Sequence, residues 1–403
     1  MISISDKHTC CGCGACAQRC PKQCISMKPD DEGFLYPRVD EAFCIGCDLC
    51  EKVCPCLIQG EPQKPIKVYS VVNPNEAIRK ESSSGGAFTM IAEEVINEGG
   101  VVFGARFNDS WEVIHTYTES KEGLEAFRGS KYVQSRIGDT FIQASEFLKK
   151  GRKVLFTGTP CQIAGLKLFL RKEYENLLTI DVVCHGVPSP LIWRDYLTAL
   201  SVNTIGLVEN KKNVPTQIDR NKISRISFRD KISGWKKYSF VVRSSQYNSQ
   251  SETRKEEILL QETLDKNLYL QLFLRNLDLR PSCYTCPFKS GKCKSDFTLG
   301  DFWGYSNEDS QIDDDKGISL VLVNTKVAKE IIRKYDRSIV ESTYDAAYKG
   351  NVTLEHSAQK PKHAAVFWSH YHNSGIKSAV HIIDKLRPSL LRIFISRVIK
   401  RMI

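Results

Sequence analysis

Eight cysteines near the start of the sequence fall into two runs with the same spacing. The first run, CCGCGACAQRCP, covers residues 10–21, and the second, CIGCDLCEKVCP, covers residues 44–55. Both contain C-x2-C-x2-C-x3-C-P, the spacing with which a short bacterial loop wraps thiolates around an iron-sulfur cubane. The two runs therefore predict two 4Fe-4S clusters at the N-terminus.

In this motif the fourth cysteine of each run normally ligates the cluster of the other run. The expected ligands are Cys10, Cys13, Cys16 and Cys54 for the first cluster, and Cys44, Cys47, Cys50 and Cys20 for the second. Cys11, Cys24 and Cys56 have no assignment in this scheme. The alternative interpretations are a disulfide framework or zinc knuckles.

A second group of cysteines lies far along the chain. Cys161 falls in the first turn of a predicted helix within TGTPCQIAGLK, Cys184 ends a predicted strand, and Cys283 and Cys286 form a C-x-x-C pair. Together they offer four soft ligands, which suit a third 4Fe-4S cluster or a structural zinc ion. A metal-free role is the remaining alternative, and Cys293 is a competing fifth thiol.

Two glycine-containing stretches have the composition of cofactor loops. SSSGGAF, residues 82–88, precedes a predicted helix, where free N–H groups and the helix dipole favour an anion. Simple N-capping by Ser84 is the alternative. GDFWG, residues 300–304, places aromatics among glycines and either lines a flat cofactor or forms a packed turn. The chain contains no G-x-G-x-x-G fingerprint, so a nicotinamide site is not supported.

The elements that must position these residues follow an α/β pattern after a short linker, LIQGEPQKPIK. We predict a small N-terminal domain over residues 1–62, a mixed α/β domain over 66–345 and a C-terminal extension over 346–403. Strands are expected at 68–72, 101–107, 112–118, 153–156, 178–183, 223–229, 237–243 and 318–323. Helices are expected at 87–97, 139–150, 162–171 and 258–276, and polar loops at 203–222 and 244–256.

Composition restricts the class of protein. The chain has 403 residues with 41% hydrophobic and 26% charged content, and no run of about 18 apolar residues. Its net charge of +10 falls to roughly +4 once three clusters, each about −2, are counted. We therefore expect no nucleic-acid binding. The start lacks an apolar signal region, and sixteen cysteines outside an oxidising compartment suit metal or redox work, so a cytoplasmic location is expected.

The C-terminal segment LRPSLLRIFISRVIKRMI has the pattern of a basic amphipathic helix. Leu391, Ile395, Val398 and Met402 share one helical face, and basic residues occupy the remainder. Three interpretations stay open: peripheral contact with an anionic inner-membrane surface, docking of a partner, and packing on its own domain.

Five ordered motifs behind the two cysteine runs resemble the family of coenzyme F-420 hydrogenase/dehydrogenase beta subunits. They are SSSGGAFT, RGSKYVQS, TGTPCQIAGLK, VCHGVPSP, and LRPSCYTCPFK with SDFTLGDFWG, and the resemblance covers residues 5–345. The resemblance implies a dicluster 4Fe-4S domain followed by a mixed α/β flavin-binding domain. It makes Cys161, Cys184, Cys283 and Cys286 the ligands of a third 4Fe-4S cluster.

The resemblance also implies bound FAD. The flavin neighbours carried over from the family motifs are Ser83, Ser84, Gly85, Gly86, Ser130, Lys131, Tyr132, Thr157, Gly158, Thr159 and Asp301. A flavin has a physical rationale beside clusters, because clusters pass single electrons whereas most organic reductions take two. No residue is an obvious acid or base, and His185 is the candidate catalytic residue.

Three functions follow from these features. The first is an oxidoreductase that relays electrons between a ferredoxin-like partner, the clusters and FAD, and acts on an organic substrate or a deazaflavin. The second is an electron-transfer subunit whose chemistry takes place on a partner protein. The third is a scaffold with structural metal. The sequence contains no motif that identifies the small-molecule substrate.

Overall fold

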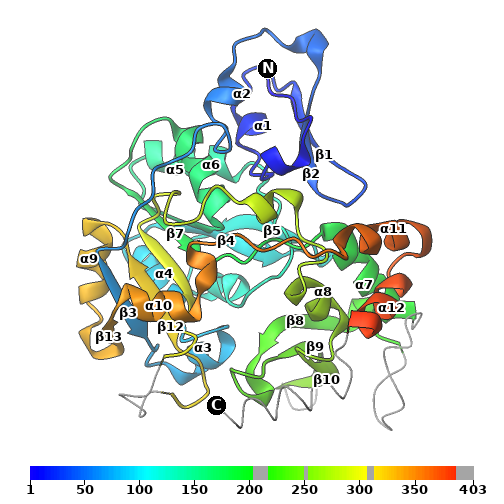
Figure 1. Cartoon of the computed structure of the whole chain (residues 1–403). Helices are drawn as coiled ribbons and strands as arrows, with labels where there is room; N and C mark the ends of the chain where they lie inside the picture. The colour runs from blue at the N-terminus through cyan, green and yellow to red at the C-terminus, as the bar shows by residue number, and fades with distance from the viewer. Residues whose placement is uncertain (203–216, 249–252, 306–312, 387–403) are drawn as a thin grey trace.

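The computed structural model describes residues 1–202, 217–248, 253–305 and 313–386 (Figure 1). Within these residues the largest element is a mixed sheet of eight strands in the order β13-β3-β12-β11-β7-β6-β4-β5. The strands are β3 (Lys67–Val71), β4 (Val101–Phe107), β5 (Val113–Thr118), β6 (Val154–Gly158), β7 (Leu177–Val182), β11 (Phe297–Asp301), β12 (Ser319–Val323) and β13 (Ile339–Ser342). The four central strands β4, β6, β7 and β11 are parallel, and the outer strands pair antiparallel.

Helices cover both faces of this sheet. Because successive side chains of a strand point to opposite faces, Val102 and Leu155 pack toward one helical layer, and Phe103 and Phe156 pack toward the other. The first layer contains α4 (Ala87–Asn97) and α9 (Lys326–Arg333), and the second contains α5 (Thr140–Lys149) and α6 (Pro160–Leu170). The result is a three-layer arrangement in which the parallel strands are buried on both faces.

A small N-terminal module, residues 1–62, packs against the α5–α6 layer (Figure 1). It contains α1 (Ala15–Arg19), α2 (Leu49–Lys52) and an antiparallel hairpin of β1 (Ile25–Pro29) and β2 (Leu35–Val39). The Gln18 side chain accepts hydrogen bonds from Phe141 N and Ile142 N at the start of α5. Residues 66–386 are called the α/β body below.

A second sheet, β8 (Ile223–Asp230), β9 (Ser239–Asn248) and β10 (Thr253–Thr263), is antiparallel throughout. The remaining α-helices are α3 (Glu76–Glu81), α7 (Pro190–Val202), α8 (Leu268–Leu274), α10 (Tyr344–Gly350), α11 (Ala364–Ser374) and α12 (Lys377–Leu386). Short 3-10 helices are η1 (Lys7–Thr9), η2 (Glu41–Phe43), η3 (Glu122–Phe127), η4 (Arg220–Lys222), η5 (Lys231–Ser233), η6 (Pro281–Thr285), η7 (Asp336–Ser338) and η8 (Val352–Leu354). Together with the strands, these elements account for the regular structure of the described residues.

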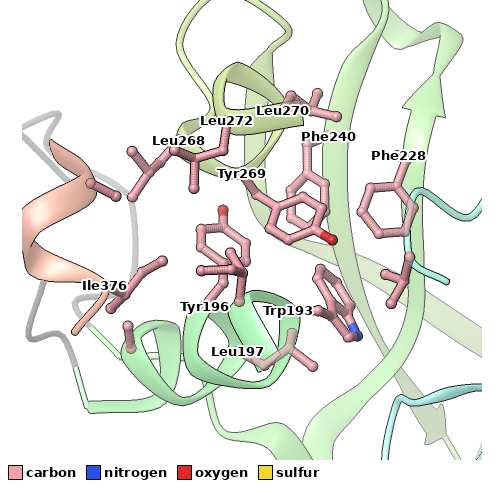
Figure 2. Packing of buried hydrophobic residues seen from close by; sticks show 14 of the residues in the cluster. Trp193, Tyr196, Leu197, Phe228, Phe240, Leu268, Tyr269, Leu270, Leu272 and Ile376 are labelled. Atoms are coloured by element: carbon pink, nitrogen blue, oxygen red, sulfur yellow. The ribbon is translucent and has the colours of Figure 1, made fainter. Parts of the chain in front are cut away.

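An aromatic cluster joins the second sheet to α7 and α8 (Figure 2). Trp193 lies at its centre, with ring centroids 5.0 Å from both Phe228 and Tyr269. Its indole is 1% exposed, and Nε1 donates to Trp111 O at 2.6 Å. This cluster fixes the position of α8, which precedes the loop that carries Cys283.

Replacing Trp193 with alanine is expected to lower the free energy of unfolding by about 3–5 kcal/mol, because a large buried side chain is lost and a cavity remains. Urea denaturation followed by circular dichroism measures the change. The control is Val366→Ala at a position 48% exposed on α11, which should change the free energy by less than about 0.5 kcal/mol. Equal effects of the two substitutions would show that the aromatic cluster does not stabilise the fold.

Two sequence predictions in this region are wrong. Residues 258–276 do not form one helix, since β10 continues to Thr263 and α8 begins at Leu268, where the Asn267 side chain caps it by accepting from Leu270 N. The predicted loop at 244–256 forms much of the β9–β10 hairpin. In both cases pairing with β9 decides the structure, against a helical pattern at 258–263 and against polar composition at 244–256.

The structure describes only part of the predicted C-terminal extension, as far as residue 386. Helix α10 spans the predicted boundary at 345/346, and Asn351 beyond it donates from Nδ2 to Asp301 O at 3.0 Å. The predicted basic amphipathic helix lies in 387–403, outside the described residues. Among the described residues, no helix combines the length and apolar character needed to cross a membrane.

Candidate cluster and cofactor sites

A thiol-lined cavity of about 20 Å³ lies inside the N-terminal module beside α1. Its turn is built by Gly12 and Gly14 with φ of +71° and +73°, a backbone conformation that favours glycine. The predicted first-cluster thiols, Cys10, Cys13, Cys16 and Cys54, all line it, and so do Cys11 and Cys56. The structure therefore places Cys54 of the second run with three cysteines of the first.

A matching cavity of about 20 Å³ lies on the outer side of the module. The predicted second-cluster thiols, Cys44, Cys47, Cys50 and Cys20, line it together with Cys24. The Cys20 and Cys24 sulfurs are 3.4 Å apart, and Ile2 N donates to Cys50 Sγ at 3.4 Å. Cys20 of the first run thus faces three cysteines of the second, as the crossed motif requires.

These two cavities fit a cubane cluster better than a single ion. The first lining is apolar apart from the thiols, the second also includes Lys22 and Asp48, and in both the thiols surround a space rather than a point. Within the described ranges no three His, Cys, Asp or Glu side chains stand close enough to hold one metal ion. Each cavity instead gathers three predicted ligands from one cysteine run and one from the other around a void.

The four distant cysteines come together at the start of α6. Cys161 lies in the first turn of α6, Cys184 follows β7, and Cys283 and Cys286 lie in and after η6. Burial raises the pKa of the Cys184 thiol, and the charges of Cys283, Cys161 and Cys286 act in the same direction. These four thiols are therefore neighbours in space, although the first and the last are more than 100 residues apart in sequence.

Two cysteines that sequence reasoning left unassigned lie between the first cavity and Cys161. Cys11 packs in the same buried cluster as Cys13, Cys56 and Cys161, and these neighbouring thiols raise its pKa. The only sequence signals were the Cys10–Cys11 doublet and the C-P-C spacing of Cys54–Cys56, and neither is part of the cluster motif. A continuous array of thiols therefore leads from the module into the α/β body.

Cys293 takes a different position from the four distant cysteines. It is 2% exposed and donates to the buried Asp181 carboxylate at 3.3 Å. Ser295 and Thr298 also donate to Asp181, at 2.7 and 2.6 Å. Cys293 is thus held in a polar network on β7 and β11.

The predicted flavin neighbours collect at one edge of the large sheet, where β6 and β11 end at Gly158 and Asp301. This edge is called the carboxyl edge below, and it is where open α/β sheets place their ligands. The loop of residues 82–86 reaches the same edge: Gly85 lies against Val71 O and Ser319 N, so tightly that a Cβ would overlap them. Ser83 Oγ accepts from Ser130 N at 2.6 Å, which joins this loop to residues 130–132.

Ser84 does not cap α4, so the capping interpretation of this loop is wrong. The N-cap is Gly86 with φ of +88°, and Ser84 Oγ donates to Ile318 O at 2.6 Å. At α6, Thr159 is the N-cap and forms a capping box with Gln162, whose side chain accepts from Thr159 N at 2.9 Å. The carboxyl edge therefore presents the N-terminus of α4 without an acidic residue in its first turn.

Two lysines near this edge donate only to backbone carbonyls. Lys131 Nζ donates to Arg128 O and Gly129 O, and burial, with the charge of Arg225, lowers its pKa to about 7. Lys231 Nζ donates to three carbonyls, and burial, with the charges of Arg79 and Arg229, lowers its pKa to about 7. Neither lysine forms an ion pair with a carboxylate of the described chain, so each, when protonated, leaves its positive charge at the edge for an anion.

The GDFWG segment is packed against protein on its aromatic side. Trp303 stacks on Trp235 with centroids 4.6 Å apart and planes 9° from parallel, and Phe302 is 1% exposed. Asp301 forms an ion pair with Arg229 and accepts from Trp235 Nε1 at 3.1 Å. Arg229 Nε and Nη2 are buried without hydrogen-bond partners among the described residues, so polar groups remain unsatisfied beside Asp301.

Tyr132 and His185 lie on either side of Phe273. Tyr132 stacks on Phe273 with centroids 4.4 Å apart, and His185 meets the same ring edge-on at 5.3 Å. His185 Nε2 is hydrogen-bonded to Asn276 Oδ1, and burial lowers its pKa. The imidazole is thus held neutral and oriented, next to Cys184 and close to the bridge between Pro188 and Leu279.

A cavity of about 670 Å³ lies between the N-terminal module and the α/β body. It opens beside Cys20 on the module and Arg136, Trp193 and Arg194 on the body. Its volume would accept a small molecule, but its lining does not include the loop at 82–86. The cavity therefore adjoins both thiol groups, through Gly12 and Gly14 of the first and Cys20 of the second, rather than the carboxyl edge.

Comparisons with known proteins agree with this arrangement. A 4Fe-4S dicluster domain model matches residues 9–58. Two models described as "Coenzyme F420 hydrogenase/dehydrogenase, beta subunit", one N-terminal and one C-terminal, match residues 68–140 and 151–346. The chain belongs to the family of coenzyme F-420 hydrogenase/dehydrogenase beta subunits. A 4Fe-4S domain joined to the domains of this family gives the chain a redox role in electron transfer.

Curated relatives from this F-420 family cover part of the chain. A subunit of the F(420)H(2) dehydrogenase of Methanosarcina mazei is 26% identical over 46% of this chain and 55% of its own length. "Coenzyme F420-dependent sulfite reductase" of Methanocaldococcus jannaschii is 26% identical over 57% of this chain and 36% of its own length. The chain thus spans about a half and a third of these relatives.

A solved structure also aligns with part of this chain. It is a chain of the F420-reducing NiFe hydrogenase complex from Methanosarcina barkeri, with 15% identity and a TM-score of 0.45. The alignment covers 73% of this chain and 91% of that one.

Proposed function

We propose that this protein is an iron-sulfur flavoprotein oxidoreductase. Electrons pass one at a time between a ferredoxin-like partner, two clusters in the N-terminal module and a third cluster in the α/β body. FAD at the carboxyl edge then exchanges two electrons with an organic substrate or a deazaflavin. The observation that carries this proposal is that Cys11 and Cys13, which line the first cavity, pack in one buried cluster with Cys56 and Cys161.

The two N-terminal clusters are assigned to the crossed thiol sets of the two cavities. The third cluster is assigned to Cys161, Cys184, Cys283 and Cys286, because these thiols influence one another electrostatically. Cys293 is left out because its sulfur already donates to Asp181. The position of Cys161 at the N-terminus of α6 also stabilises a thiolate.

FAD is assigned to the carboxyl edge. The support is chemical: an anion would meet Lys131 and Lys231, neither of which pairs with a carboxylate of the described residues, and the N-terminus of α4. When bound, FAD supplies the exchange between single electrons and electron pairs. The residues that we assign to it are Ser83, Ser84, Gly85, Gly86, Ser130, Lys131, Tyr132, Thr157, Gly158, Thr159 and Asp301.

His185 is assigned to proton handling near the cofactor. Its Nε2 is hydrogen-bonded to Asn276 Oδ1, and burial favours the neutral imidazole, which accepts a proton at one nitrogen. Asn276 orients the ring, which lies beside Cys184 in sequence and beside Phe273 in space. We therefore expect His185 to serve as an acid and base only while Asn276 holds it.

A second candidate function is an electron-transfer subunit whose substrate is bound by a partner protein. The observation that favours it is that the Methanosarcina mazei relative is itself one subunit of a dehydrogenase. The cavity beside Cys20, open between the module and the body, would let a partner's redox group approach the second cluster.

Anaerobic purification followed by iron, sulfide, zinc and flavin assays tests the first proposal. About twelve irons and twelve sulfides with one FAD per chain are expected from three clusters. Zinc with no flavin would overturn it. Turnover of a candidate acceptor by the isolated chain, with reduced ferredoxin or viologen as donor, supports the enzyme. Reduction of the flavin without any turnover supports the electron-transfer role.

The affinity of the apoprotein for FAD is expected to fall as pH rises from about 7 to 9. The empty-site pKa of Lys131 is about 7, so above that pH a diphosphate binds only after the neutral amine takes up a proton. For one proton the dissociation constant then rises by up to about tenfold per pH unit. Equilibrium dialysis or flavin fluorescence measures it.

The matched variants are Lys131→Met and Lys121→Met. The first should bind FAD more weakly near pH 7 and show a smaller slope with pH, because its titrating amine is gone. Lys121 is exposed beside the nearby 3-10 helix η3 and should behave as the wild type. An unchanged slope in Lys131→Met would remove Lys131 from the anion site.

A further inference from the structure

Arg280 lies in the contact between the N-terminal module and the α/β body, three residues before Cys283. It is 0% exposed, although a guanidinium stays charged at any pH that proteins tolerate. It is the N-cap residue of η6, which packs against η1 of the module. Burying an unpaired charge costs free energy, so a buried Arg280 needs a compensating negative charge nearby.

The partners of Arg280 are neutral groups and one thiol. Its Nε donates to Cys10 O at 2.8 Å, one Nη to the Gln134 side chain at 2.9 Å, and the other to Leu35 O at 3.0 Å. The same Nη2 points at Cys10 Sγ, 3.6 Å away. The guanidinium also lies over the rings of Tyr36 and Phe34, at 4.3 and 5.5 Å.

No carboxylate of the described residues forms an ion pair with Arg280, whereas the buried Arg229 pairs with Asp301. The acidic groups whose charges act on Arg280 are those of Cys10, Tyr36, Cys11 and Cys283. Three of these four are thiols that border the first cavity or belong to the distant set. The described residues therefore supply no carboxylate to balance the positive charge of Arg280. The negative charge is left to the thiolates and the group that they bind.

The backbone of the cysteine loop is built around this side chain. A Cβ at Gly12 would lie 2.6 Å from Arg280 Nη1 and 3.0 Å from Gln134 Nε2, so only glycine fits between the first two ligands. Gln134 Nε2 donates in turn to Cys11 O at 3.0 Å. Arg280 and Gln134 thus donate hydrogen bonds to the carbonyl groups of Cys10 and Cys11, at the start of the first cluster loop.

We propose that Arg280 is the buried counter-ion of the first 4Fe-4S cluster and raises its reduction potential relative to the second. This inference rests on the proposed function for the presence of the clusters. Reduction adds one electron from a ferredoxin-like donor to the cluster, and the nearby positive charge stabilises the added negative charge. The first cluster, which faces the third-cluster thiols, then becomes the favoured acceptor within the module.

The test is an EPR-monitored redox titration of the holoprotein, with the second cluster as an internal reference. Arg280→Gln should shift the equilibrium between the first cluster and a fixed donor at least tenfold toward oxidised cluster, which is about 59 mV for one electron. The second cluster should not move. The control Arg38→Gln makes the same charge change at an exposed position on β2 and should shift neither cluster, since solvent screens it.

Gln134→Glu is a second variant that keeps Arg280 in place. It sets a carboxylate beside Nη1 without a change of size and so neutralises the guanidinium, with loss of the hydrogen bond from Gln134 Nε2 to Cys11 O. The same downward shift of the first cluster is expected, even if Arg280→Gln fails to assemble. Full iron content with an unmoved first-cluster potential in Gln134→Glu would overturn the inference, whereas a wild-type protein without cluster signals would overturn the proposed function instead.

Discussion

Replacement of Cys47 with alanine is expected to stop electron delivery from reduced ferredoxin while bound FAD stays reducible by dithionite. Cys47 is the exposed member of the second thiol group, and loss of one ligand should cost the protein that cluster. Iron should fall by about four per chain. The proposed FAD site lies in the α/β body, at the opposite end of the proposed chain of carriers, so the FAD content should be unchanged.

The matched control is Cys24→Ala. Cys24 lines the same cavity and its sulfur is 3.4 Å from that of Cys20, but it lies outside the spacing motif. This variant should keep its iron and accept electrons at the wild-type rate. If Cys47→Ala lost FAD together with iron, the module and the body would not be the separable units that the proposal requires.

Replacement of Cys184 with alanine is expected to remove the third cluster and interrupt transfer to FAD, with the module's two clusters intact. Cys184 is the best position for this test, because the thiols that act on it electrostatically are Cys283, Cys161 and Cys286, all proposed ligands. Cys161 is a poorer choice, since Cys11 contacts it and offers a substitute sulfur. Iron analysis and EPR of the reduced protein should show a loss of about four irons and one signal.

Cys293→Ala is the matched control for Cys184→Ala. Cys293 is buried and Cys184 is partly buried, but Cys293 donates to Asp181 rather than facing the other thiols. Its replacement should keep all iron and destabilise the fold only slightly. Loss of iron from this variant and not from Cys184→Ala would make Cys293 the fourth ligand.

Much of the fold could be predicted where one physical signal dominates. The central strands are continuous apolar runs such as Val154–Phe156, since parallel strands are buried on both faces. The crossed thiol groups follow from spacing alone, and the structure gathers the same eight cysteines into two cavities. The hairpin of β9 and β10 was missed because its polar residues are stabilised by strand pairing, which composition does not reveal.

The sequence motifs indicated candidate residues for the site, but not the contacts that those residues make. Asp301 and Lys131 were carried over from family motifs, yet the pairing of Asp301 with Arg229 joins residues 72 apart in sequence. Arg280 meets Cys10 across 270 residues, and no local pattern marks an arginine as the one that will be buried against the module. The positions of Cys11 and Cys56 could likewise not be predicted, because they depend on how the module packs against the body.

The segment between the module and the body was predicted as a linker, and its contacts have a consequence for how the protein works. Gln63 N donates to Ser290 O at 2.8 Å, Gln63 Nε2 donates to Asn324 O at 2.8 Å, and Gly291 packs against Gln63 O. These contacts therefore hold the linker against the body. If electrons follow the proposed path, we expect transfer without movement of the N-terminal module, at a rate that depends on fixed distances rather than on solvent viscosity.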